Sequence, residues 1–464
     1  MGYFSRQFTK KILARRLVFL LLFFVAGNFF AQNKNQTQTR NQTQNQPNIE
    51  PLFTTPDYTT YTADEIFELG LLYSECERGS QAWNNAWQKF EHIKQGMAAI
   101  SKDAQTPEAL GNTILKLLYA ECLKEYSEKQ TRLDVALETG LYNCVSSAVL
   151  YLAVAKLAGL DVRGQKTTQH AFCTVYVPTE QTNKLKKIDV ETTNPYGFNP
   201  GSKQTFQRED ELKGYYVVPK TYYSNRQEVS DAVFTGLIAG NVCSFYVEKN
   251  EYTNAVTLGA ARYTAVINEK TKAAQDVRNE FDVLASNYVN IVPDNAAGFA
   301  PRLEWFCSFV DRWGMTSFLQ ENMDTAVSNM LVLCYQEGNE ELAQAVGQKY
   351  KAYVSAKNVS TIEEMQWLYV LNNLMNSGDY ENGYVAAVQA QDLLPKSTKI
   401  KNMKNAFYSN CITLVHNAFA DSANCGQYEQ ARELLLEGLK KYPDDKTLKK
   451  DLSDLERFIS RMNQ

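Results

Sequence analysis

The chain has 464 residues, of which 44% are hydrophobic and 22% are charged, so its length allows two or three folded domains. Its formal net charge of −4 lacks the basic excess of a nucleic-acid-binding protein, and we expect no nucleic-acid partner. Its nine cysteines include no CxxC pair. We expect most of them to be small buried residues, and the sequence leaves one or two disulfides open.

The first 31 residues are typical of a secretory signal peptide. Basic residues between Arg6 and Arg16 precede an apolar run from Leu17 to Ala26, and Ala31 is a small residue at a suitable cleavage point. The run is shorter than the roughly 20 residues of a membrane-spanning helix. We therefore predict an exported protein, periplasmic or extracellular. The alternative is an uncleaved segment that anchors the chain and is its sole contact with a membrane.

Residues 32–56 are rich in Asn, Gln and Thr and contain few apolar residues. Such a segment buries too little apolar surface to offset the entropy of ordering the chain, so we predict a disordered linker. Beyond it we expect two folded domains, at residues 57–228 and 229–464.

Two sequence patterns indicate helices before the middle of the chain. Thr62 and Glu65 have the spacing of a capping box, and apolar residues at helical spacing follow. A second helix is expected at residues 110–124. Further on, Asn143 is a natural N-cap for a helix that begins at Cys144 and is apolar almost all round, which is typical of a buried helix.

After this helix the apolar pattern changes to a period of two. Residues 170–177 alternate between two faces, with His170 on one face and Cys173 on the other. Residues 185–190 predict a second strand, and residues 214–218 a third. The middle of the chain therefore predicts an α+β domain, with a buried helix followed by antiparallel strands.

This region places a thiol, an imidazole and a carboxylate in order along the chain. The first turn of a helix favours the thiolate form of a cysteine, and Cys144 is expected there. His170, at the start of a strand, can take the thiol proton, and Asp189 can fix the orientation of the imidazole. Glu191 points the same way as Asp189 and is the alternative acid. The backbone N–H of Cys144 is the expected oxyanion donor, with Asn143 or Tyr142 as candidates for support.

Other interpretations of the same residues stay open. Cys144 could be a small core residue, and His170 an ordinary strand histidine. A zinc site formed by Cys144, His170, Cys173 and Asp189 is disfavoured because Cys173 and His170 face opposite sides of a strand. We expect no metal and no cofactor.

From about residue 229 to the end, the sequence predicts helices with weak internal repetition. Gly426-Gln427-Tyr428 with Ala431 resembles a tetratricopeptide unit, and Gly378-Asp379-Tyr380 is a partial match with Gly383 where alanine is expected. Weaker matches start at Gly338 and Asn250. The starts are irregularly spaced, so we predict degenerate helical hairpins that bind a protein partner. The alternative is a generic helical domain.

Residues 140–201 resemble the transglutaminase-like superfamily of papain-type folds. The matching pieces are Tyr142-Asn143-Cys144, Leu150-Tyr151-Leu152-Ala153, Gly159-Leu160, Gln169-His170-Ala171-Phe172 and the segment from Ile188 to Asn194. The resemblance implies a papain/transglutaminase-like core in which Cys144, His170 and Asp189 act as nucleophile, base and orienting acid. Bacterial members of this superfamily also occur with tetratricopeptide repeats, although some of these have lost the cysteine.

Two functions follow as hypotheses. In the first, the chain is an exported cysteine-dependent enzyme that transfers acyl groups or hydrolyses amide or peptide bonds in a protein or peptide substrate. Hydrolysis needs no second substrate site, which favours a peptidase or amidase. In the second, it is a non-enzymatic binding protein whose helical repeats hold a partner and whose transglutaminase-like domain is inert.

Overall fold

A computed structural model describes residues 53–462, apart from 55–57, 101–105, 180–183, 201–217, 219, 224 and 292. These residues belong to one compact unit, residues 47–464. The predicted signal peptide and nearly all of the predicted linker lie outside the described residues. No helix within the described ranges is both long enough and apolar enough to cross a membrane.

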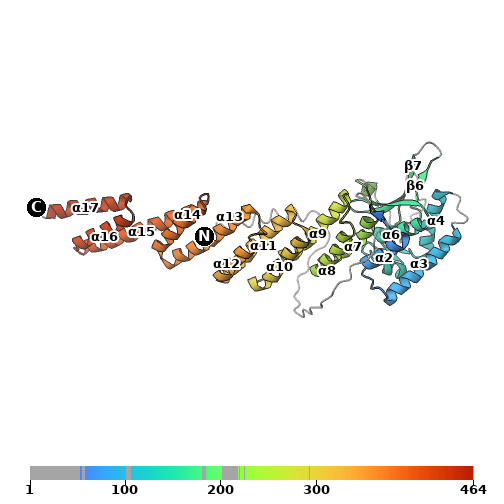
Figure 1. The fold of residues 1–464 in the computed structure, drawn as a ribbon, viewed down its shortest axis with the longest axis horizontal. Coiled ribbons are helices and arrows are strands. Elements are labelled where there is room, and N and C mark those ends of the chain that lie inside the picture. The colour runs from blue at the N-terminus through green and yellow to red at the C-terminus, as the bar shows by residue number, and fades with distance from the viewer. Residues whose placement is uncertain are drawn as a thin grey trace. The chain divides into compact units, whose positions relative to one another are not determined.

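The described residues form 16 α-helices and a small antiparallel sheet, with a C-terminal region made of helices (Figure 1). The sheet has the order β7-β6-β5-β8. Its strands are β5 (Asp161–Lys166), β6 (Ala171–Pro178), β7 (Leu185–Val190) and β8 (Gln227–Val229). The α+β mixture and the helical C-terminal region are therefore as predicted.

The strand predictions differ in their outcomes. Strands β6 and β7 confirm those predicted at residues 170–177 and 185–190. The strand predicted at residues 214–218 lies outside the described residues except for Val218, which belongs to no strand. Strand β5 was not predicted, because only Val162 in it is a strong strand former. In β5, Gly164 is required because a Cβ there would lie 2.3 Å from the Phe234 ring.

Two short strand pairs and four helices precede the helix of Cys144. Strands β1 (Phe53–Thr54) and β2 (Thr59–Thr60) pair antiparallel, and β3 (Glu125–Tyr126) and β4 (Leu141–Tyr142) pair parallel. The helices are α2 (Ala63–Tyr73), α3 (Gln81–Ile100), α4 (Pro107–Glu121) and α5 (Leu133–Thr139). The Thr62–Glu65 capping box is present at the start of α2, and α4 confirms the helix predicted at residues 110–124.

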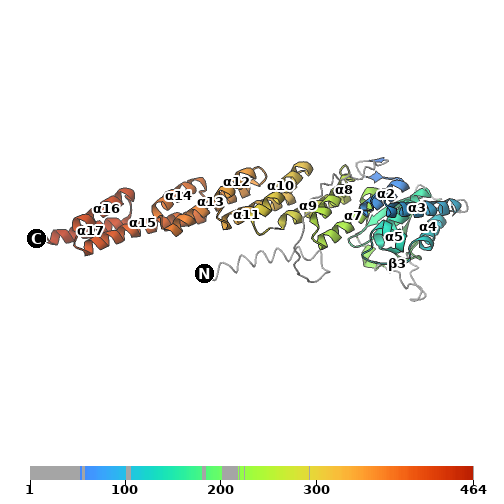
Figure 2. The same cartoon turned by 90° about the horizontal axis from the view of Figure 1, so that it is seen from below.

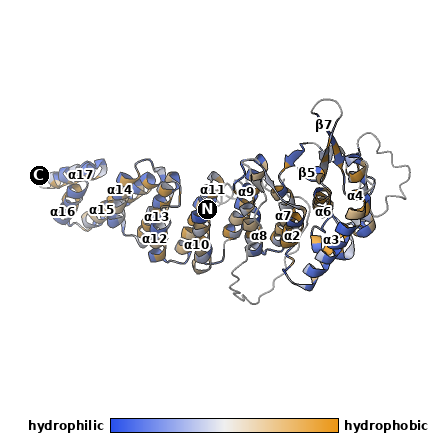
Figure 3. Ribbon diagram, turned by 45° about the vertical axis from the view of Figure 1, so that its right-hand side comes forward, coloured by the Kyte–Doolittle hydropathy of each residue, from blue (hydrophilic) through white to orange (hydrophobic). Residues whose placement is uncertain are grey.

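Helix α6 (Cys144–Leu157) is the central element of the α+β part. It packs against β5 and β6 of the sheet and against α2 and α4, and Figure 3 shows its hydrophobic character. Eleven residues of α6, from Val145 to Ala155, are buried. Gly159 follows the helix in a left-handed conformation (φ 78°), which ends it as predicted. The start of α6 is therefore held in place by packing on several sides.

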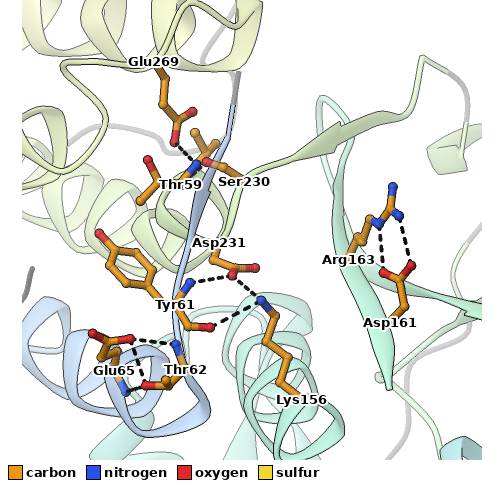
Figure 4. A network of polar contacts seen from close by, with 11 residues as sticks. Thr59, Tyr61, Thr62, Glu65, Lys156, Asp161, Arg163, Ser230, Asp231 and Glu269 are labelled. Carbon is orange, nitrogen blue, oxygen red and sulfur yellow. Dashed lines mark hydrogen bonds and ion pairs between the residues drawn. The ribbon is translucent and has the colours of Figure 1, made fainter. Parts of the chain in front are cut away.

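A polar network joins the chain segment before α2 to helix α6 and to helix α7 (Asp231–Glu248), the first helix of the C-terminal region (Figure 4). Asp231 accepts a hydrogen bond from the Tyr61 N–H (2.9 Å) and pairs with Lys156. The Thr59 N–H donates to Glu269 Oε1 (3.1 Å). Buried hydrophobic residues form one continuous cluster from α2 to Val277 in helix α9 (Lys272–Asn290). The α+β part and the first helices after it therefore share one core.

The C-terminal region consists of helical hairpins in which each hairpin contacts the next in chain order (Figure 2). The helices are α7 (Asp231–Glu248), α8 (Tyr252–Thr264), α9 (Lys272–Asn290), α10 (Ala296–Trp313), α11 (Ser317–Gln336), α12 (Glu340–Lys349), α13 (Ala356–Ser377), α14 (Tyr380–Leu393), α15 (Thr398–Asn424), α16 (Tyr428–Lys441) and α17 (Lys446–Met462).

Each predicted repeat motif falls on the turn of a hairpin. Asn250, Gly338, Gly378 and Gly426 are left-handed, with φ of 61°, 69°, 75° and 76°, and each ends the first helix of its pair. The hairpin α9–α10 has no such motif and occupies the long interval between Asn250 and Gly338. The irregular spacing of the motifs therefore reflects one hairpin that lacks the motif and helices of unequal length.

Gly383 departs from the alanine expected at its position, and its surroundings explain why. A Cβ at Gly383 in α14 would lie 2.1 Å from the ring of Phe407 in α15, which is fully buried. The corresponding Ala431 in α16 is also fully buried. The large Phe407 ring therefore occupies the space that an alanine methyl group would need.

We expect Gly383→Ala to destabilise the protein by about 1–3 kcal/mol, because the added methyl group overpacks a buried contact. The matched control is Gly96→Ala in α3, where the nearest atom to a new Cβ is 3.5 Å away. There, the gain in helix propensity is expected to stabilise the protein by up to about 1 kcal/mol. Chemical denaturation measures both changes. Equal effects of the two substitutions would contradict the packing argument.

Candidate active site

Cys144 is the first residue of α6, and the preceding residue fixes the start of that helix. The side-chain oxygen of Asn143 accepts hydrogen bonds from the backbone N–H groups of Val145 and Ser146, each at 3.0 Å. In return, Ser146 Oγ accepts from the Asn143 N–H (3.0 Å), which completes a capping box. Cys144 is half-buried, and its thiol lies where helix N–H groups and the helix dipole favour a negative charge.

His170 ends the tight connection between β5 and β6. Its carbonyl oxygen accepts hydrogen bonds from the Thr167 N–H (2.8 Å) and Thr167 Oγ1 (3.2 Å). Its Nε2 lies 2.6 Å from Glu191 Oε2, and the side chain of Cys144 is close enough to raise the pKa of the ring. Since Nε2 is engaged by Glu191, Nδ1 is the nitrogen left for the thiol. The imidazole thus lies between a thiol and a carboxylate.

Glu191 follows directly after β7, and both of its carboxylate oxygens accept hydrogen bonds. Oε2 accepts from Tyr223 Oη (2.7 Å) as well as from His170, and Oε1 accepts from the Thr193 N–H (3.1 Å) and Thr193 Oγ1 (2.9 Å). The side chains of His170 and Glu191 are only 2% and 1% exposed. A buried carboxylate with this set of donors is fixed in orientation and compensated for its loss of water.

Asp189, the predicted orienting acid, has other partners. Arg226 donates to its Oδ2 (2.7 Å) and Oδ1 (2.8 Å), and Thr174 Oγ1 donates to Oδ1 (2.8 Å). Asp189 pairs in register with Thr174, which is four residues past His170 and so about 13 Å further along the strand. Glu191 lies two residues nearer to His170 along the antiparallel pair of strands, and it is on the same face of the sheet as Asp189. The expectation that Asp189 lies beside His170 is corrected: Glu191 lies there.

The segment around Glu191 is held by hydroxyl groups from α4, β4 and α6. Tyr119 Oη donates to the Thr192 carbonyl oxygen (2.8 Å), and Tyr142 Oη to that of Thr193 (3.1 Å). Ser147 Oγ and Thr192 Oγ1 are 2.8 Å apart. These contacts tie the carboxylate segment to the helix that begins at Cys144.

A glycine closes the turn after Glu191. The Glu191 N–H donates to the Gly197 carbonyl oxygen (2.8 Å). A Cβ at Gly197 would lie 1.8 Å from the Glu191 carbonyl oxygen, so no larger residue fits without moving the backbone of Glu191. The close approach of these two backbones therefore depends on a glycine.

The surroundings of His170 favour its charged form. Burial by itself lowers the pKa of His170, but the hydrogen bonds to Cys144 and Glu191 and the negative charges of both groups outweigh it and raise the pKa to about 10. The imidazole is therefore held as imidazolium at neutral pH. An imidazolium next to Cys144 stabilises a thiolate and can give its proton to a leaving group.

Asn143 was a candidate for oxyanion support, but its side chain caps the helix. Its oxygen is used by α6, and its Nδ2 donates to the Glu128 carbonyl oxygen (3.1 Å). By contrast, the backbone N–H of Cys144 has no acceptor among the residues that the structure describes. This N–H is therefore the group left to meet a negatively charged oxygen near the thiol.

The zinc alternative finds no support in the geometry. Cys173 points toward α6, where its Sγ lies 3.4 Å from the Ala148 carbonyl oxygen, away from His170. In the described ranges, no group of three or more His, Cys, Asp or Glu residues could hold a metal ion. All nine cysteines are unpaired, and of these only Cys425 is exposed.

Tyr223 and Arg226 belong to this site but were not identified in the sequence. Tyr223 lies in the short 3-10 helix η3 (Lys220–Tyr223), more than 30 residues after β7, and Arg226 directly precedes β8. No spacing rule links them to His170, because sheet pairing between β8 and β5 brings them there.

Glu191→Gln and Asp189→Asn together test which acid acts on His170. We expect Glu191→Gln to slow alkylation of Cys144 by iodoacetamide at about pH 6 by about tenfold or more. The reason is that lowering the pKa of His170 by one unit reduces the population of the thiolate–imidazolium pair, relative to the neutral pair, by about tenfold. Asp189→Asn, the matched control, should stay within about twofold of the unmodified protein. If Asp189→Asn slows alkylation more than Glu191→Gln does, then Asp189 and not Glu191 is the acid that acts on His170.

Comparison of the chain with models of known protein families, with curated proteins and with solved structures found no match.

Proposed function

We propose that this chain is a cysteine-dependent enzyme that cleaves amide or peptide bonds or transfers the acyl group, with Cys144 as nucleophile, His170 as acid and base, and Glu191 as the acid that orients His170. The observation that carries the proposal is the position of a single buried imidazole between a half-buried thiol at a helix start and a buried carboxylate. We propose a protein or peptide substrate.

The proposed reaction has two steps. In the first, the Cys144 thiolate attacks the substrate carbonyl carbon, and the oxygen that becomes negative meets the Cys144 N–H. His170 then gives its proton to the departing amine, and the carbonyl group stays on sulfur as a thioester. In the second step, water or an acceptor amine attacks the thioester carbon while His170 takes its proton. The C–S bond then breaks, the acyl group leaves as a carboxylic acid or an amide, and Cys144 is released as the thiolate beside the protonated His170. Hydrolysis needs only water, which favours a peptidase or amidase.

The fold supports a more specific proposal for each part of the chain. The helix of Cys144 packed on an antiparallel sheet is consistent with a papain/transglutaminase-like core. The hairpins with left-handed turn residues are consistent with degenerate tetratricopeptide-like repeats that bind a partner or a substrate protein. We further propose that the protein is exported, on the strength of its N-terminal sequence alone.

Selective alkylation tests the proposed nucleophile. We expect Cys144 to react with iodoacetamide at about pH 6 at least about tenfold faster than Cys425, because a thiolate is the reactive form and the imidazolium stabilises it. Cys425, the exposed cysteine, is the internal control, since access to solvent alone would favour it. Peptide mapping by mass spectrometry measures both rates in one sample.

His170→Gln should remove the difference between Cys144 and Cys425, since glutamine can still donate to Glu191 but cannot carry charge. If Cys425 reacts as fast as Cys144 in the unmodified protein, the enzymatic proposal fails. The non-enzymatic binding protein would then be the better account.

A further inference from the structure

Tyr223 contacts the His170–Glu191 pair directly. Its hydroxyl donates to Glu191 Oε2 (2.7 Å), the same oxygen that lies 2.6 Å from His170 Nε2. Both donors therefore converge on one oxygen atom. The Tyr223 hydroxyl and His170 Nε2 together fix the position of that oxygen. The position of the oxygen in turn sets the orientation of the imidazole.

The ring of Tyr223 also packs against the imidazole. It meets the His170 ring edge-on (centroids 6.0 Å apart, 79°) and the Phe172 ring in the same way (5.1 Å, 70°). Phe172 stacks on His170 (6.1 Å, 18°), and the Arg226 guanidinium lies 4.9 Å from the Phe172 ring centroid. Phe172 lies on the face of the sheet that points away from α6, because its neighbour Cys173 points toward α6. It is nevertheless fully buried. Tyr223 thus helps to keep water from this face of the pair.

The hydroxyl of Tyr223 keeps its proton throughout the working pH range. Burial, followed by the negative charges of Glu191 and Asp189, holds the pKa of Tyr223 well above its usual range, and only the nearby Arg226 opposes this. Tyr223 is therefore a permanent hydrogen-bond donor to Glu191. The neighbouring Tyr222 lies at a similar distance from the imidazole (6.3 Å, 49°), but no contact of its hydroxyl with Glu191 is present.

We propose that Tyr223 is a positioning residue of this site: its hydroxyl fixes Glu191 Oε2 toward His170, and its ring shields the His170–Glu191 hydrogen bond from water. This inference rests on the proposed function and adds a residue to it. Tyr223 does not touch the thiol in the structure, so it acts on Cys144 only through Glu191 and His170.

The test compares Tyr223→Phe with Tyr222→Phe in the full chain. The rate of Cys144 alkylation by iodoacetamide is followed as a function of pH. In Tyr223→Phe the ring contacts stay but Glu191 loses a donor, so we expect the rate at about pH 6 to fall by about threefold to tenfold and the acid limb to move to higher pH. At about pH 9, the rate should match that of the unmodified protein. Tyr222→Phe should leave the whole profile unchanged.

A merely structural role would give a different result, because a loosened fold would change the rate at every pH or expose other cysteines. An unchanged profile in Tyr223→Phe, or an equal shift in Tyr222→Phe, would overturn the role of Tyr223 alone. If Cys144 of the unmodified protein is no more reactive than Cys425, the proposed function fails, and this inference fails with it.

Discussion

The hydrogen bond between His170 Nε2 and Glu191 Oε2 is the interaction on which the site depends. Both side chains are almost completely buried, and a buried ion pair is stable only when its remaining donors and acceptors are satisfied. Thr193 and Tyr223 supply donors to Glu191, and Cys144 raises the pKa of the imidazole. Loss of either partner would leave a buried charge uncompensated.

The rest of the α+β part can be understood as support for this pair. Helix α6 places Cys144 at its first turn, and Asn143 fixes where that turn begins. The hydroxyls of Tyr119 and Tyr142 hold the backbone just after Glu191. The thiol comes from a helix, the imidazole from the start of a strand, and the carboxylate from the end of its neighbour. Their mutual geometry is therefore set by how the helix packs on the sheet.

Much of this arrangement could be predicted from local sequence. The N-cap at Asn143 and the alternation after His170 are short-range patterns, and the structure has both. The turns at Gly338, Gly378 and Gly426 were visible because a left-handed residue favours glycine. Such features depend on neighbours in the chain, which is why sequence patterns reveal them.

The remainder depends on contacts that are distant in sequence. The register between β6 and β7 determines whether Asp189 or Glu191 lies beside His170. Alternation of polar and apolar residues does not specify that register when one face of the strand is polar. Strand β5 is held by backbone pairing on both sides rather than by apolar alternation. Tyr223 lies shortly before β8, and the pairing of β8 with β5 brings it close to Glu191. Gly383 is explained only once Phe407 is seen against it.

The central claim is that Cys144 and Glu191 together hold His170 in its charged form, and the ionisation of His170 tests it most directly. The ring carbon and nitrogen chemical shifts of His170, assigned by their loss in His170→Gln, can be followed by NMR as a function of pH. The account predicts that the ring stays charged well above neutral pH, with a pKa of about 10. Titration of His170 near the ordinary value of about 6.5 would contradict it.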